Sequence, residues 1–188
     1  MGIITVEQIV SVDGYAVESG AGLSFFDEFD RSDDPSDVDQ RSWLASVDAI
    51  LLGRSTYEMF NAFWPTVDSE SDPVAVRINT LPKHVVTATL DEAPWGAGDE
   101  VEVHADGPVA TAESLRDRYD SIVVWGSLDL TDALFDAGLV DVLRLRTVPV
   151  LIGAGRSFSP GIAGHRRLTL EHSTALSTGH VSTQYRVR

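Results

Sequence analysis

The chain has 188 residues, a hydrophobic fraction of 43% and a formal net charge of −15. These values are typical of a globular protein with a buried core, so we expect residues 1–188 to form one domain. A pI of about 4.5 argues against nucleic acid or an anionic membrane as a partner. The chain has no cysteine, which excludes disulfides and thiolate chemistry. It shows neither a signal peptide nor an apolar stretch long enough for a bilayer, so a cytoplasmic location is expected.

The first third of the chain predicts a strand, a long loop and a helix. Residues 3–12 are rich in Ile and Val and predict a central strand that ends in a turn at Ser11–Gly14. Residues 20–40 predict a loop, and a helix is expected from about 36 to 46. The loop carries three phenylalanines, Phe25, Phe26 and Phe29. Two roles are open for them, which are docking at the rim of a pocket and covering the sheet edge.

The segment 48–60 predicts a strand, a glycine turn and a helix. The apolar run 49–52 has the length of a buried strand, Gly53 allows a sharp turn, and aromatic residues follow at helical spacing. Unpaired N–H groups at a helix start bind anions, and the planar guanidinium of Arg54 suits phosphate. Taken alone, however, a Gly-Arg pair is more typical of an ordinary turn with a surface arginine.

The middle of the chain predicts a second unit of the same kind. Five further elements are expected, which are helices at 73–81 and 112–119 and strands at 85–87, 101–104 and 122–125. The last of these strands leads to Gly126–Ser127 and to a helix over 128–137, closed by Gly138. Two glycine turns at the carboxyl ends of strands can together hold one diphosphate.

The C-terminal part predicts a long strand at 142–151 and a hairpin, with strands at 167–176 and 181–187. The hairpin ends the sheet and has no proline to blunt its edge, so we expect it to contact a second copy of the chain in a homodimer. The negative charge opposes association, but salt screens it within about 8 Å. The order of elements predicts a three-layer α/β domain, with a mixed, mostly parallel sheet and helices on both faces.

Several catalytic motifs are absent from the sequence. It contains no Gly-x-Gly-x-x-Gly, no P-loop and no Gly-x-Ser-x-Gly. The five histidines show no metal-ligand spacing with acidic residues on one helix face, so no metal site is expected. Hydride transfer needs none of these motifs, because the cofactor carries the chemistry. A protein that only binds a nucleotide would lack them equally.

Four short segments, in order along most of the chain, carry a family resemblance. They are Ser11–Gly14, Gly53–Glu58, Trp125–Leu128 and Pro149–Gly155. This set resembles the dihydrofolate reductase fold, and more closely its branch related to the riboflavin-biosynthesis reductase, the RibD C-terminal domain. The resemblance implies an NADPH-dependent reductase of a small planar heterocycle, similar to a pterin or an aminopyrimidine. A flavin or deazaflavin donor, and a nucleotide-binding or regulatory protein without turnover, are the alternatives.

The resemblance also implies site residues, although it assigns no catalytic residue. The cofactor-binding residues it implies are Gly53, Arg54, Ser55, Thr56, Thr87, Gly126, Ser127 and Leu128. Arg54 and Thr87 would converge on the 2′-phosphate of NADPH. The substrate-side residues it implies are Asp13, Tyr15, Trp43 and Thr147. Asp13 and Thr87 are equally typical of an ordinary turn and an ordinary strand. Trp125 stands where the family often has a glycine, and its ring is expected either to narrow the cofactor approach or to point into the core.

Overall fold

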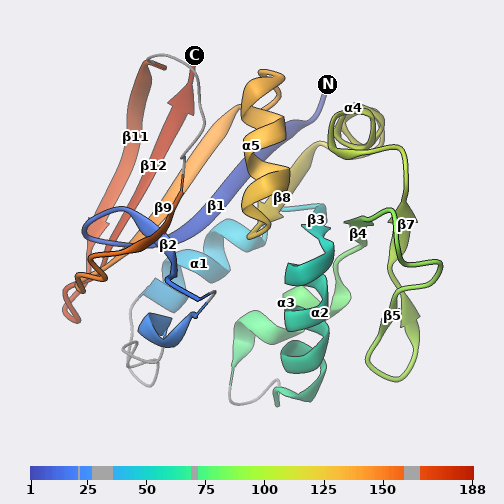
Figure 1. Cartoon of the computed structure of the whole chain (residues 1–188), viewed down its shortest axis with the longest axis horizontal. Coiled ribbons are helices and arrows are strands. Elements are labelled where there is room, and N and C mark those ends of the chain that lie inside the picture. The colour runs from blue at the N-terminus through green and yellow to red at the C-terminus, as the bar shows by residue number, and fades with distance from the viewer. Residues whose placement is uncertain (21, 27–35, 69–71, 159–165) are drawn as a thin grey trace.

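The computed structural model describes residues 1–20, 22–26, 36–68, 72–158 and 166–188 (Figure 1). They form one α/β domain around an eight-stranded sheet in the order β11-β12-β9-β1-β8-β3-β4-β7. The six strands from β9 to β7 are parallel to one another, whereas β12 is antiparallel to both β9 and β11. This arrangement confirms the expected mixed, mostly parallel sheet with a C-terminal hairpin at one edge.

The secondary structure follows the expected order. The large sheet contains β1 (Ile3–Ser11), β3 (Ala49–Gly53), β4 (Lys83–Val86), β7 (Glu102–His104), β8 (Ser121–Trp125), β9 (Val142–Val148), β11 (Leu168–Ala175) and β12 (Val181–Val187). Two small ribbons pair β2 (Tyr15–Glu18) with β10 (Gly155–Ser157), and β5 (Pro94–Trp95) with β6 (Asp99–Glu100). The helices are α1 (Ser36–Leu44), α2 (Arg54–Phe63), α3 (Pro73–Thr80), α4 (Pro108–Arg118) and α5 (Leu128–Asp136). Helix α4 begins earlier than expected because Pro108 suits the first helical position.

Helices cover both faces of the sheet, because successive side chains of a strand point to opposite sides. On β3, Ile50 and Leu52 pack into a cluster with residues of α1, α2 and α3. Leu51, between them, packs into a second cluster with residues of α4 and α5. The sheet is therefore the middle layer of three, and the turns that follow its parallel strands gather at one end (Figure 1).

The phenylalanine-bearing loop is described only in part. A short 3-10 helix at Ser24–Phe26 buries Phe25 to 4% exposure. Phe26 lines the main cavity, so the rim role holds for this residue. Phe29 lies outside the described residues. Within the described chain, none of the helices combines the length and apolarity that a bilayer crossing requires.

Candidate functional site

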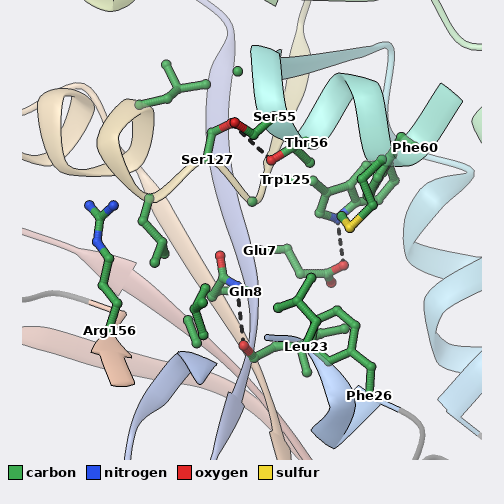
Figure 2. A pocket seen from close by; sticks show the side chains of 18 of the residues that line it. Glu7, Gln8, Leu23, Phe26, Ser55, Thr56, Phe60, Trp125, Ser127 and Arg156 are labelled. Atoms are coloured by element: carbon green, nitrogen blue, oxygen red, sulfur yellow. Dashed lines mark hydrogen bonds between the residues drawn. The ribbon is translucent and has the colours of Figure 1, made fainter. Parts of the chain in front are cut away.

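The main cavity, of about 1070 Å³, lies at the carboxyl ends of β1, β3 and β8 (Figure 2). Parallel strands end on the same side of a sheet, so the helices that follow β3 and β8 both begin beside this cavity. Its walls combine polar groups from these turns with the aromatic rings of Phe26, Phe60 and Trp125. A large cavity with apolar walls and a few convergent polar groups is the usual form of a small-molecule site.

Helix α2 presents a free N-terminus to the cavity. Gly53 is its N-cap residue, and no side-chain hydrogen bond caps it among the described residues. The first N–H groups therefore remain available to an anion, at the positive end of the helix dipole. Arg54 lies beside them, with Nε 2.8 Å from Glu58 Oε1 and Nη1 2.8 Å from Thr89 Oγ1. Two partners orient the guanidinium, and its remaining donors suit a phosphate.

Helix α5 presents a second N-terminus through a different backbone. Gly126 and Ser127 have φ values of 56° and 51°, both in the left-handed region. For a residue with a side chain, this conformation costs about 1–3 kcal/mol and is typical of functional sites. Ser127 is the N-cap residue, but its hydroxyl lies 3.0 Å from Thr56 Oγ1 instead of capping the helix. The hydroxyl pair thus joins the two helix starts (Figure 2). No side chain of the described residues caps α5, so its first N–H groups remain available.

An acidic residue in the first turn of α5 is neutralised from another element. Asp129 is almost fully exposed and lies 2.8 Å from Arg156 on β10. Arg156 also lies 3.0 Å from Asp132, one turn further along the helix. Asp129 and Arg156 both line the cavity. The two helix starts therefore differ in charge, because α2 carries its own cation and α5 depends on one from β10.

Glu7 on β1 holds a buried polar network at the cavity floor. Its Oε1 accepts from Gln40 Nε2 at 2.7 Å and from Trp125 Nε1 at 2.8 Å, and its Oε2 accepts from Arg144 Nε at 3.0 Å. Both Glu7 and Arg144 are 4% exposed. All these donors are side chains of the protein, so the Glu7 carboxylate holds Gln40, Trp125 and Arg144 in place beneath the cavity. Trp125 therefore lines the cavity with its ring and donates its indole N–H to Glu7.

Gln8, the next residue, is held much less completely. Its side chain lines the cavity and is buried, with the residue 7% exposed. Its Nε2 donates a long bond of 3.3 Å to the Ile9 carbonyl, and its Oε1 has no partner among the described residues. Burying an acceptor without a donor lowers the stability of the fold, and a ligand N–H that donates to this oxygen would remove that penalty. The sequence alone gave no signal for either Glu7 or Gln8, because both lie within an apolar strand pattern.

Most residues expected to bind the cofactor line this cavity. They are Gly53, Arg54, Ser55, Thr56, Gly126, Ser127 and Leu128. Thr87 is not among the described lining residues, and its hydroxyl lies 3.3 Å from that of Thr89. Thr89 is the residue whose hydroxyl contacts Arg54, so Thr87 reaches Arg54 only through Thr89, and a contact of Thr87 with the cofactor stays a prediction. The strand ends at Val86 and the chain bends at residues 88 and 89, so strand periodicity gave no signal for Thr89.

None of the four residues expected on the substrate side is among the described residues that line the cavity. Asp13 instead holds its own turn, where its carboxylate accepts from Ser11 Oγ at 2.6 Å and from the Gly153 N–H at 2.8 Å. These bonds, led by the one from Ser11, lower the pKa of the Asp13 carboxyl. Thr147 lies within the sheet, in register with residues of β1 and β12.

Neighbours of the other expected residues line the cavity in their place. Trp43 packs under Arg144, whose guanidinium lies 4.1 Å from the ring centroid, and Gln40 is the residue of α1 at the cavity. Arg146 lines it where Thr147 was expected, because one step along a strand reverses the side-chain direction. On β2 the lining begins at Ala16, the residue after Tyr15. Three of the expected elements, β2, α1 and β9, therefore border the cavity through neighbouring residues, and contact of the four named residues with a substrate stays a prediction.

The same fold occurs in solved structures. A putative riboflavin biosynthesis protein from Shewanella sp. PV-4 is 19% identical, with a TM-score of 0.77 over 99% of both chains. The dihydrofolate reductase of Enterococcus faecalis, solved with NADP(H), is 15% identical, with a TM-score of 0.58 over 100% of this chain and 97% of the enzyme. These similarities confirm the expected dihydrofolate reductase-like fold.

Sequence comparison places the chain within a family. The uncharacterized protein YwjB of Bacillus subtilis is 23% identical over 163 residues, which are 86% of this chain and 85% of that protein. The family model of the RibD C-terminal domain matches residues 3–182, nearly the full chain described above. The chain therefore belongs to the RibD C-terminal domain family.

Proposed function

We propose that this protein is an NADPH-dependent reductase of a small planar heterocycle, similar to a pterin or an aminopyrimidine. The observation that carries the proposal is that two helix N-termini, those of α2 and α5, border one cavity and have no side-chain cap from the described part of the chain. Such N-termini bind phosphate groups, and a pair of them suits the diphosphate of a dinucleotide. Family membership supports the proposal, as does the NADP(H) bound by the dihydrofolate reductase of Enterococcus faecalis.

The residues beside α2 fit the additional phosphate of NADPH. Arg54 is about half-exposed, and Glu58 and Thr89 orient its guanidinium. A 2′-phosphate there would receive charge-assisted bonds from donors that already point in a fixed direction. NADH lacks this phosphate and would gain little from the arginine. The preference for NADPH should therefore depend on Arg54.

The inner part of the cavity fits a flat, nitrogen-containing ring. Phe26, Phe60 and Trp125 provide apolar surface, and the free Oε1 of Gln8 would accept from a ring N–H or an exocyclic amino group. When bound, NADPH supplies the hydride. The chain's own residues orient the two molecules and keep water away from them. Replacing Gln8 with leucine keeps the bulk but removes the acceptor, so binding of an aminopyrimidine should weaken by up to about tenfold, the net worth of one hydrogen bond.

The central test compares NADPH and NADH binding by calorimetry. Arg54→Ala should weaken NADPH binding by about 1.5–3 kcal/mol and leave NADH binding nearly unchanged. Arg186→Ala is a matched control, because Arg186 is similarly exposed and also pairs with a glutamate, Glu171, but lies on β12 away from the cavity. Equal losses for both nucleotides would contradict the assignment. So would binding of a flavin or deazaflavin in place of both.

We further propose a homodimer formed through the C-terminal hairpin. Strand β11 is an edge strand, and it exposes Leu168 at 38% and Leu170 at 55%. Unpaired apolar edges are normally covered, and a second copy of the same strand is the simplest partner. Sedimentation at moderate salt should give twice the 20.4 kDa chain mass, and Leu170→Glu should halve it. A wild-type mass of one chain at all concentrations would contradict this proposal.

A further inference from the structure

Strands β4 and β7, at the sheet edge opposite the hairpin, bring three metal-ligating side chains together. His84 is in register with Glu102, and His104 follows Glu102 by two residues, so the three lie on one face. His84 Nδ1 lies 3.0 Å from His104 Nε2 and 3.4 Å from Glu102 Oε2. Glu102 Oε1 lies 3.6 Å from His104 Nε2. None of the three is among the residues that line the main cavity.

These separations match the spacing of donors around a small cation. In tetrahedral zinc sites the bonds to nitrogen and oxygen are about 2.0–2.2 Å, which places neighbouring donor atoms roughly 3.3–3.5 Å apart. The three observed separations, 3.0, 3.4 and 3.6 Å, lie around that value, and the two that involve Glu102 run to its two different oxygens. With one donor atom taken from each residue, all three atoms lie within 4.8 Å of one another, so a single ion could contact all three side chains.

The surrounding residues orient two of the donors. His84 Nε2 lies 3.2 Å from the hydroxyl of Tyr119, so a proton on Nε2 leaves the Nδ1 lone pair directed at His104 and Glu102. Arg118 donates to both oxygens of Glu102 at 2.8 Å, one bond to each, which leaves a lone pair on each oxygen. Hydrogen bonds of this kind to the far side of a ligand are a regular feature of metal sites.

We propose that His84, Glu102 and His104 bind one zinc-type divalent metal ion, with a fourth position left to water. Two imidazoles and one carboxylate favour Zn²⁺ and its neighbours over Mg²⁺ and Ca²⁺, which prefer oxygen donors. The ion links the edge strand β7 to β4. Because the Thr87 N–H donates to the His104 carbonyl at 3.0 Å, the same link steadies the segment that carries Thr89 to Arg54. The expectation of no metal site rested on helical spacing, and it missed these three residues because they lie on strands β4 and β7.

The test measures Zn²⁺ binding by calorimetry on the untagged full chain after treatment with a chelator. One ion should bind per chain, Mg²⁺ should not compete, and Co²⁺ should give the visible absorption of a tetrahedral site. His104→Ala should weaken Zn²⁺ binding by at least about tenfold, the usual minimum even for changes outside the ligand set. His172→Ala is the control for loss of a histidine elsewhere, because His172 lies on β11, at the opposite edge of the sheet.

A second variant covers the case in which His104→Ala fails to fold. Glu102→Gln keeps the shape of the side chain and should also lose at least about tenfold in affinity. Wild-type protein that binds no Zn²⁺ would overturn the proposal, as would binding that the folded variants of His104 and Glu102 leave unchanged. The Zn²⁺ calorimetry and the Co²⁺ absorption are both independent of nucleotide binding, so they do not depend on the proposed reductase activity.

Discussion

The two glycine turns that border the cavity look alike in sequence but need glycine for different reasons. Gly53 has φ −89° and ψ 166°, an extended conformation open to any residue. Space is what requires it, because an added Cβ would lie 2.7 Å from the Ser127 Cβ. Gly126 is required by conformation as well, since its φ is 56° and its added Cβ would lie 2.6 Å from Thr56 Oγ1. Each turn is thus packed against the start of the other helix.

The two turns depend on each other for space. The hydroxyls of Thr56 and Ser127 meet at 3.0 Å, and each glycine makes room for one of these side chains. The turns also differ in charge, with Arg54 at the start of α2 and the Asp129–Arg156 pair at the start of α5. Substitutions can separate conformation, space and charge.

The largest effect is expected at Gly126. Gly126→Val should lower the free energy of unfolding by about 2–5 kcal/mol, because it combines left-handed strain with a clash against Thr56. Urea denaturation, monitored by circular dichroism, measures this free energy of unfolding. Gly138→Ala serves as a control for strain alone, since Gly138 has φ 69° but no atoms within 4 Å of an added Cβ. If Gly126→Ala lowered the free energy of unfolding no more than Gly138→Ala does, the packing of the two turns would not contribute to stability.

The second prediction concerns Gly53 and tests space without strain. Gly53→Ala should cost about 1–3 kcal/mol of stability through its contact with Ser127. Adding Ser127→Gly removes the obstructing atoms and should recover most of that loss, with a coupling of about 1–2 kcal/mol in a double-mutant cycle. Thr56→Ala should not recover Gly126→Ala to the same degree, because the left-handed φ remains. Additive effects at Gly53 and Ser127 would contradict direct packing.

The smallest effect is expected from the charges at the start of α5. Arg156→Ala leaves Asp129 unneutralised and should weaken NADPH and NADH equally, by about two- to fivefold, the range for one charge near a helix end. Asp129→Asn should strengthen both by a similar factor, and the double variant should resemble the wild type. Calorimetry at low and physiological salt measures this, and the effect should shrink as salt rises. A loss specific to NADPH would instead place its 2′-phosphate at Arg156.

Local patterns in the sequence were enough to predict the fold class and the starts of α2 and α5. Strand periodicity and the glycines at 53 and 126 predicted both strand–turn–helix units, and most of the residues named at those turns line the cavity. The C-terminal hairpin was equally visible. Such features depend on a few neighbouring residues, so a linear pattern contains them.

The tertiary structure decided which side chains meet. Glu7 and Arg144 pair across 137 positions, and no local pattern links them. A step of one residue separates Arg146 at the cavity from Thr147 within the sheet, because the side-chain direction alternates along a strand. His84 meets Glu102 and His104 only because β4 and β7 are adjacent and in register. Periodicity fixes which residues share a face, but the packing of other elements decides whether that face meets the core, the cavity or another strand's side chains.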